Sequence, residues 1–156
     1  MHFRDRAITA LSRALRAIWD RAPARERPLP ATPRVLVLKP CCLGDVLMAT
    51  PVVAALRTRW PTATLDFAVG PWSRPMLAHN PHIDHLLDCG RVGSGAYRLS
   101  DWLALTRRVR AGGYQVCLVL DRSPALALIP ALAGVPQRVG LDSDGRGFSL
   151  TQRVPV

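Results

Sequence analysis

The sequence of 156 residues lacks several short motifs that would directly indicate its chemistry. It contains neither the GxGxxG dinucleotide fingerprint nor the GxxxxGK phosphate loop, so both of these nucleotide-binding signatures are excluded. The four cysteines form no CxxC pair, and adjacent cysteines such as Cys41 and Cys42 rarely bridge each other. We therefore expect neither a disulfide framework nor a structural zinc site.

Targeting and membrane signals are also missing. The first residues lack an apolar core followed by a small-residue cleavage site, and no apolar run approaches the roughly 20 residues that a membrane span needs. His79, His82 and His85 are spaced by three, but Pro81 would interrupt a helix through them, so we expect no metal site. These absences predict a cytoplasmic protein with reduced thiols.

Lysine is nearly absent, because Lys39 is the only one, and arginine carries almost all of the formal net charge of +10. Guanidinium groups pair bidentately with phosphates, which fits a nucleotide, a nucleic acid or an anionic membrane surface. Solvated arginine faces in a protein from a GC-rich genome would produce the same excess. Nucleic acid is not expected, since no basic helix interleaved with aromatic residues and no recognised nucleic-acid motif is present.

The first 33 residues are predicted to form an amphipathic helix and a linker. Apolar residues recur at spacings of three and four over residues 3–19, with arginines mostly on the other side of the helix. Such a helix suits either an anionic membrane surface or packing against a protein surface, and the pattern leaves both open. Residues 22–33 form a Pro-rich linker.

Residues 34–156 are predicted to form one α/β domain. The expected strands, found from short apolar runs bounded by turn residues, are 35–38, 64–69, 83–87, 116–120 and 138–141. The expected helices begin at Gly44, where Pro51 implies a kink or a late start, and also cover 73–79, 97–111 and 124–133. This alternation predicts a Rossmann-like parallel sheet with helices on both faces. The last residues stop on a polar stretch, as though the chain were cut short.

Ligands bind such sheets beyond the carboxyl ends of the strands, where residues 40–45 and 121–123 are expected. Gly44 permits close backbone approach, and the free N–H groups of the following helix start favour an anion. Asp45 suits a helix cap or a general base, and the residues alone leave both roles open. Asp121 and Ser123 suit either the wall of the same cleft or a structural turn with a cap.

The segment VLVLKPCCLGDVLMATPVVAALRTRWPTATLDFAVG resembles the opening of the heptosyltransferase family, glycosyltransferase family 9. The resemblance includes the GD and TP pairs, a later Asn80-Pro81 segment and Arg138-Val139-Gly140, and it extends over roughly residues 34–154. It implies the N-terminal, acceptor-binding half of a GT-B fold. The C-terminal half, which would bind a nucleotide-sugar donor such as ADP-heptose, is absent from the sequence.

The resemblance also implies an inverting, metal-free transfer without a cofactor, in which Asp45 is the base that deprotonates the acceptor hydroxyl. The expected substrate-binding residues share the same sheet edge and are Lys39, Cys41, Cys42, Gly44, Asp121 and Ser123. Lys39 matches a basic position and would pair with an anionic acceptor group or with Asp45. Cys41 and Cys42 stand where many members have serine or another small residue.

The acceptor implied is a glycolipid or glycan at the cytoplasmic face of the inner membrane, where the basic surface would suit peripheral binding to anionic lipid. Without its donor half, the chain is expected to be inactive alone. The alternative is a catalytically silent Rossmann-like module that binds an anion or a protein partner.

Overall fold

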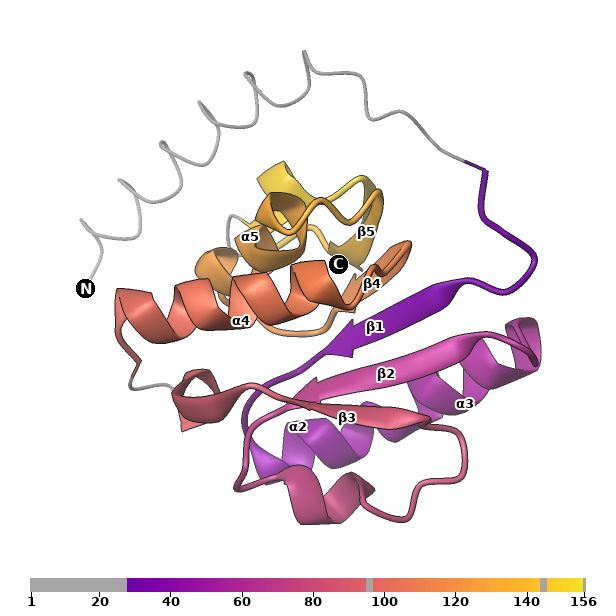
Figure 1. The fold of residues 1–156 in the computed structure, drawn as a ribbon, viewed down its shortest axis with the longest axis horizontal. Helices are drawn as coiled ribbons and strands as arrows, with labels where there is room; N and C mark the ends of the chain where they lie inside the picture. Colours follow the sequence, from indigo (N-terminus) through magenta and orange to yellow (C-terminus); the bar gives the residue numbers. More distant parts are fainter. Residues whose placement is uncertain (1–27, 95–96, 144–145, 156) are drawn as a thin grey trace.

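The computed structural model describes residues 28–94, 97–143 and 146–155. They form a sheet of six parallel strands in the order β3-β2-β1-β4-β5-β6 (Figure 1). The strands are β1 (Arg34–Leu38), β2 (Thr64–Val69), β3 (His85–Asp88), β4 (Val116–Val119), β5 (Gln137–Leu141) and β6 (Gln152–Val154). The predicted Rossmann-like parallel sheet is confirmed. The amphipathic helix predicted over residues 3–19 lies outside the described residues.

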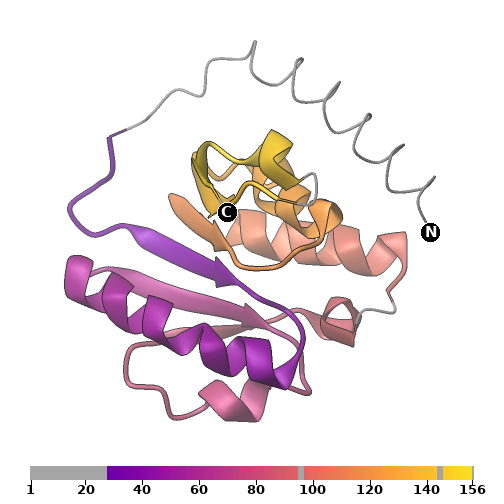
Figure 2. The same cartoon turned by 180° about the vertical axis from the view of Figure 1, so that it is seen from behind.

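Helices cover both faces of this sheet, as Figures 1 and 2 show from opposite sides. One face carries α2 (Leu43–Met48), α3 (Thr50–Arg59) and the 3-10 helix η1 (Arg74–Leu77). The other carries α4 (Leu99–Ala111) and α5 (Pro124–Leu132). Two further 3-10 helices are η2 (Gly90–Ser94) and η3 (Arg146–Ser149). The helices at 97–111 and 124–133 were therefore predicted to within two residues.

Strand β1 shows how the sequence produces two cores. Every residue of β1 after Arg34 is buried, as expected for a central parallel strand covered on both sides. Successive side chains of a strand point to opposite faces, so Val35 and Val37 pack on the side of α2 and α3, whereas Leu36 and Leu38 pack on the side of α4 and α5. The continuous apolar run therefore supplies both layers.

The helix predicted from Gly44 onward is divided into two at Ala49. Pro51 occupies the second position of α3, where its missing N–H would have no partner within the helix in any case. The proline thus marks a late start. In the first of the two helices, Leu47 is 50% accessible, although the apolar spacing from Val46 to Trp60 predicts that it lies on the buried helix face.

The last part of the sheet differs most from the prediction. Strand β6 was not expected, because three residues with two long polar side chains carry no strand pattern. Strand β6 pairs with β5. The buried Arg138 of β5 stabilises the neighbouring segments, because its Nε donates to the Ser149 carbonyl and its Nη1 donates to the Val135 carbonyl, each at 2.6 Å. Strand β3 begins at His85, two residues later than predicted, because the Asp84 side chain accepts a hydrogen bond from the Leu65 N–H.

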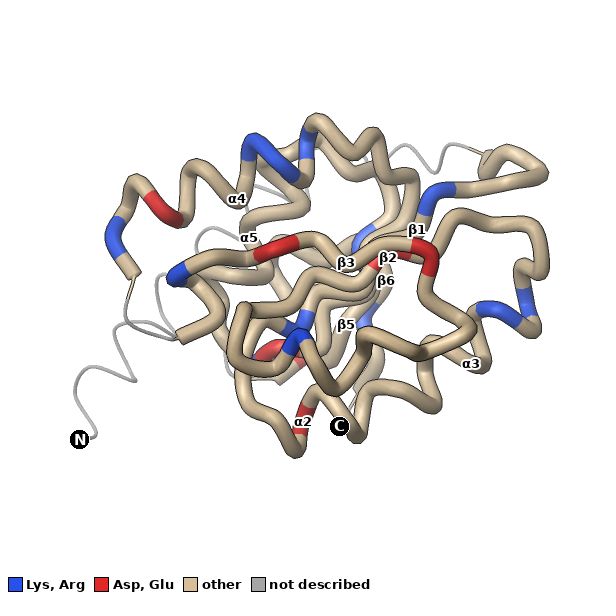
Figure 3. Tube along the Cα trace, turned by 60° about the horizontal axis from the view of Figure 1, so that its bottom comes forward, with Lys and Arg blue, Asp and Glu red and all other residues tan. Residues whose placement is uncertain are grey.

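Basic residues are spread over several elements of the described structure, with acidic positions among them (Figure 3). Some of them complete the fold. Arg57 in the last turn of α3 donates to the carbonyls of Pro61 and Ala63, and Arg108 in the last turn of α4 donates to the Asp88 carbonyl. Part of the arginine excess therefore serves helix ends, where cations are favoured by the helix dipole. Within the described residues, no helix combines the length and apolar character needed to cross a membrane.

Candidate functional site

The candidate site lies at the carboxyl ends of β1 and β4, the two neighbouring strands at which the strand order reverses direction. Lys39 and the loop of residues 40–42 follow β1, and Asp121 follows β4 after one residue. Open α/β sheets bind their ligands at this kind of switch point, because the loops diverge there and leave a crevice. The structure thus brings together the two segments that the sequence placed at one edge.

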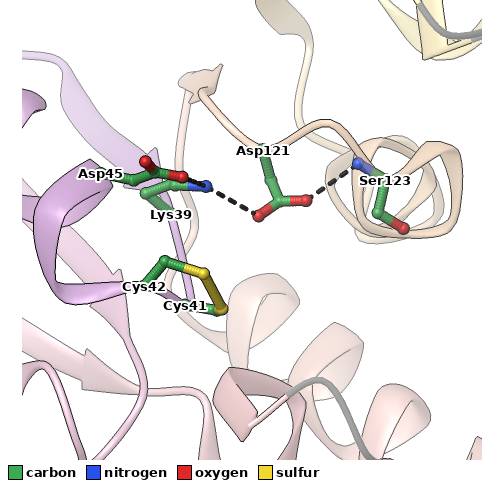
Figure 4. The surroundings of a disulfide bond; sticks show 6 residues. All are labelled: Lys39, Cys41, Cys42, Asp45, Asp121 and Ser123. Atoms are coloured by element: carbon green, nitrogen blue, oxygen red, sulfur yellow. Dashed lines mark hydrogen bonds and ion pairs between the residues drawn. A yellow bond between two sulfur atoms is a disulfide. The ribbon is translucent and has the colours of Figure 1, made fainter.

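Lys39 connects two carboxylates at this edge (Figure 4). Its Nζ lies 2.9 Å from Asp45 Oδ2 and 3.3 Å from Asp121 Oδ2. The Lys39 and Asp121 side chains are only 8% and 13% accessible, whereas that of Asp45 is 61% accessible. The Lys39 ammonium and the Asp121 carboxylate are thus largely shielded from solvent. Of the three charged groups, the Asp45 carboxylate is the one that an incoming molecule can reach.

Electrostatics keeps the Asp45 carboxyl ionised. The hydrogen bond from Lys39 and the positive charge of Lys39 lower the pKa of Asp45 below its ordinary value of 3.8, and the charge of Arg122 acts in the same direction. At neutral pH the side chain is a carboxylate with one oxygen on Lys39. The N-cap residue Cys42 makes no side-chain capping hydrogen bond, and Asp45 lies in the first turn of α2, where a carboxylate also interacts favourably with the helix dipole.

Asp121 holds the turn that leads into α5. Its Oδ1 accepts a hydrogen bond of 2.9 Å from the Ser123 N–H, while its Oδ2 lies on Lys39. Ser123 occupies the N-cap position of α5, but its hydroxyl makes no capping hydrogen bond. The Asp121 carboxylate therefore orders both the loop after β4 and the Lys39 side chain, and the Ser123 hydroxyl points away from Asp121 (Figure 4).

Cys41 and Cys42 are joined by a disulfide between adjacent residues, which corrects the expectation of reduced, unbridged thiols at this position. Cys42 has φ +75°, a left-handed backbone conformation that residues with a β-carbon rarely adopt. The turn brings the two sulfur atoms together immediately before α2. The sequence pattern did not reveal this turn, because a left-handed residue is usually signalled by glycine or asparagine.

Backbone packing anchors the start of this loop. The Pro40 carbonyl accepts a 2.8 Å hydrogen bond from the Gly70 N–H, and Gly70 in turn lies against Gly93 of η2. A β-carbon on Gly70 would lie 2.7 Å from Gly93 Cα and 2.8 Å from the Pro40 oxygen. Three chain segments therefore meet here without side chains, and this contact fixes where the loop leaves the sheet.

Gly44 lies on the exposed side of α2. Apart from its chain neighbours and the backbone of its own helix, a β-carbon there would meet no atom within 4 Å. Both Gly44 and the following residue, Asp45, are exposed. Gly44 thus leaves room at the site for a molecule from outside.

An exposed apolar group near the same edge was missed by the sequence reasoning. Met48 of α2 and Trp72, which follows β2, are each 78% accessible. Trp72 and Arg91 contribute to the lining of a hollow of about 460 Å³ beyond the ends of β2 and β3. Exposed large apolar residues around a hollow are typical of ligand or partner sites. The available signal was the Gly70-Pro71-Trp72 turn directly after a strand end.

Comparison with known proteins adds a second line of evidence. The chain is 31% identical over 123 residues to lipopolysaccharide heptosyltransferase 2 of Escherichia coli K12, covering 79% of this chain and 35% of that protein. It is 28% identical over 113 residues to lipooligosaccharide heptosyltransferase 2 of Haemophilus ducreyi, covering 72% of this chain and 32% of that protein. No family model matches the sequence.

The fold gives the same relationship. The solved structure of E. coli ADP-heptose lps heptosyltransferase II matches with a TM-score of 0.66 at 27% identity, over 77% of this chain and 34% of that one. The chain thus spans about a third of the length of the relatives it matches. The predicted fold class, the N-terminal half of a GT-B fold, is confirmed, and so is the resemblance of this chain to the N-terminal domain of the heptosyltransferases of glycosyltransferase family 9.

Proposed function

We propose that this chain is the acceptor-side part of an inverting glycosyltransferase, which transfers heptose from ADP-heptose to a lipopolysaccharide-type acceptor with Asp45 as the general base. The observation that carries the proposal is the Asp45 carboxylate: it is 61% accessible, ionised, and held at the switch point of the sheet by Lys39. The relatives' names supply the sugar and the acceptor class.

In the proposed reaction, the acceptor hydroxyl lies against the free side of the Asp45 carboxylate. As its oxygen bonds to the anomeric carbon of the donor, the hydroxyl proton passes to Asp45, and the bond from that carbon to the diphosphate breaks to release ADP. Attack from the face opposite the leaving group inverts the anomeric centre. A weakly basic carboxylate suits this step, because the hydroxyl proton becomes acidic as the new bond forms.

Lys39 and Asp121 would keep the charges matched during this step. Before transfer, the Lys39 ammonium is shared between Asp45 and Asp121. When Asp45 becomes neutral by taking the proton, Asp121 still balances the buried ammonium. Lys39 is in this proposal a positioning residue for Asp45 rather than a ligand of the acceptor, and Gly44 supplies the open space beside the base.

The nucleotide sugar is the second substrate of this proposal, which includes no cofactor. The acceptor is a glycolipid or glycan, and we place the reaction at the cytoplasmic face of the inner membrane, where basic side chains favour anionic lipid. The donor-binding domain would be supplied by a part that the present sequence does not contain. These assignments follow from the relatives and from the net charge of +10.

The test is a fusion of this chain to the remaining two thirds of the E. coli relative, assayed for ADP release from ADP-heptose in the presence of a heptose-deficient lipopolysaccharide acceptor. We expect Asp45→Asn to lower kcat by about 10²- to 10⁴-fold, the usual contribution of a general base. The matched control is Asp101→Asn, because the amide oxygen can still accept the Arg98 N–H that Asp101 accepts at the start of α4.

Full turnover by the Asp45→Asn fusion would remove the base role from Asp45. A parent fusion that folds but releases no ADP would instead favour the catalytically silent binding module. The two results separate the assignment of the residue from the assignment of the activity.

A further inference from the structure

We propose that Cys41 and Cys42 form a redox modification site, a thiol–disulfide switch that small dithiols reduce and small disulfides such as oxidised glutathione restore. The state of this switch sets the position of the first turn of α2, which carries Asp45. The exchange itself does not depend on the proposed function. Its consequence for sugar transfer does rest on that function.

Accessibility separates this pair from the other cysteines. Cys42 is exposed and Cys41 is partly exposed, whereas Cys89 and Cys117 are 3% and 0% accessible. Burial raises the pKa of Cys89 to about 12 and raises that of Cys117 as well. Because the thiolate is the reactive form, the two buried cysteines are poor partners for exchange. A reagent in solution should therefore select the pair at the end of β1.

The disulfide is placed to influence the site mechanically. Cys42 is the only non-glycine residue with a positive φ in the described ranges, and it is the N-cap of α2. Its carbonyl accepts the 2.9 Å hydrogen bond from the Val46 N–H that opens the helix. Asp45 is the third residue of that helix, so a change in the Cys42 backbone reaches the carboxylate through two residues.

The ring formed by two bridged neighbours restricts the backbone of both. After reduction this restriction disappears, and Cys42 can leave a left-handed conformation that its β-carbon disfavours. The Pro40 carbonyl remains held by the Gly70 N–H, so the movement is directed downstream, into Leu43–Asp45. The expected result is a longer separation between Lys39 and Asp45, which are 2.9 Å apart in the bridged form.

The exchange needs no group other than the thiol reagent. A thiolate of the dithiol attacks one protein sulfur, the Cys41–Cys42 bond breaks, and a mixed disulfide forms. The second thiol of the reagent then displaces the protein sulfur. One dithiol is oxidised to a cyclic disulfide, and the protein gains two electrons and two protons as two thiols. Oxidised glutathione reverses the balance and leaves as two reduced molecules.

The experiment uses the full chain, equilibrated with either dithiothreitol or oxidised glutathione, then treated in its folded state with N-ethylmaleimide and weighed intact. We expect the oxidised protein to take up no label and the reduced protein to take up two, at Cys41 and Cys42. Cys41→Ser and Cys42→Ser each retain one exposed thiol, which should label after equilibration with dithiothreitol. Cys89→Ala is the control that should leave the parent pattern unchanged.

A second readout follows the coupling directly. In backbone amide NMR spectra, the signals of Gly44 and Asp45 should shift on reduction of the parent protein and should be insensitive to dithiothreitol in Cys41→Ser. Labelling of both thiols in the oxidised protein would overturn the switch, and so would unchanged Gly44 and Asp45 signals on reduction. Neither readout involves sugar transfer, so an inactive fusion with the expected labelling would reject the proposed function alone.

Discussion

The ammonium of Lys39, the only lysine in the sequence, lies 2.9 Å from the Asp45 carboxylate and 3.3 Å from the Asp121 carboxylate. Arginine would fit poorly here, since its planar fork is larger and its donors point in fixed directions. A compact ammonium can be shared by two carboxylates, one on α2 and one in the loop after β4. The only lysine among the many arginines of this sequence therefore lies at the candidate site.

Lys39→Met replaces this ammonium with an apolar side chain of similar length. We expect the free energy of unfolding to fall by about 2 kcal/mol, because the 13% accessible Asp121 carboxylate loses its charged partner. The pKa of Asp45 should rise toward its ordinary value of 3.8. Urea unfolding at pH 7 and NMR titration of the Asp45 carboxyl measure the two effects.

The double variant Lys39→Met with Asp121→Asn should recover part of the lost stability, because the carboxylate that lost its ammonium partner is replaced by a neutral amide. Equal stability of Lys39→Met and the parent would show that the ammonium does not contribute to the fold, and that this loop is held by other contacts.

The site could be located from the sequence because it depends on where parallel strands end. The run Val35–Leu38 and the run ending at Leu120 both read as buried strands, and their following residues meet at one edge. The contact between Lys39 and Asp45 was one of two expected pairings. Its partner Asp121 required the strand order, since only the adjacency of β1 and β4 brings residues 39 and 121 together.

Other features depend on local geometry that residue types do not encode. The bridge between Cys41 and Cys42 follows from a left-handed Cys42, and nothing in the pattern distinguishes it from an extended cysteine. Strand β6 was missed because its stability comes from pairing with β5 rather than from an apolar pattern of its own. The late start that Pro51 implied could be predicted, but a helical apolar spacing alone did not show that Leu47 is half exposed.

Asp84 should contribute stability that depends on pH. Burial alone would raise its pKa, but the hydrogen bonds from the Leu65 N–H and Arg57, together with the Arg57 charge, lower it below 3.8. A lowered pKa in the folded state stabilises the protein above the unfolded-state value, and this stabilisation is lost as the pH falls through the folded-state value.

We therefore expect Asp84→Asn to lower the free energy of unfolding by about 1 kcal/mol near pH 7, a modest amount because the 40% accessible side chain is screened by solvent. The difference from the parent should stay constant between about pH 5 and pH 8 and shrink below pH 4. Urea unfolding over this pH range measures it. A difference that grows on acidification would contradict the assigned direction.

Gly70 and Gly44 should respond oppositely to the same added methyl group. Gly70→Ala places a β-carbon 2.7 Å from Gly93 Cα and 2.8 Å from the Pro40 oxygen, both backbone atoms that cannot rotate away. We expect a loss of about 2 kcal/mol in the free energy of unfolding. Gly44→Ala meets nothing within 4 Å and replaces glycine in a helix, so stability should stay equal or rise by up to about 1 kcal/mol.

Urea unfolding of both variants at one pH makes the comparison. If Gly70→Ala were as stable as the parent, the three segments at Pro40, Gly70 and Gly93 would not be packed as described. In the fusion enzyme, Gly44→Ala tests the open space as well: a stable variant with a raised KM for the acceptor would show that a substrate occupies it.

Trp72 should act on substrate binding without supporting the fold. Its side chain is 78% accessible and lies with Arg91 on the wall of the hollow beyond β2 and β3. Trp72→Ala is therefore expected to change the free energy of unfolding by less than about 0.5 kcal/mol. In the fusion enzyme, the acceptor KM should rise about tenfold, the factor that corresponds to ~1.4 kcal/mol of lost binding, while kcat stays unchanged.

Leu99→Ala is the matched control, because Leu99 is 72% accessible and belongs to α4 on the other face of the sheet. An unchanged acceptor KM in Trp72→Ala would remove this hollow from the acceptor path, since the ring has little other contact to lose. A fall in kcat at constant KM would instead connect Trp72 to the transfer step. We do not expect that result, because Trp72 follows β2, whereas Asp45 follows β1.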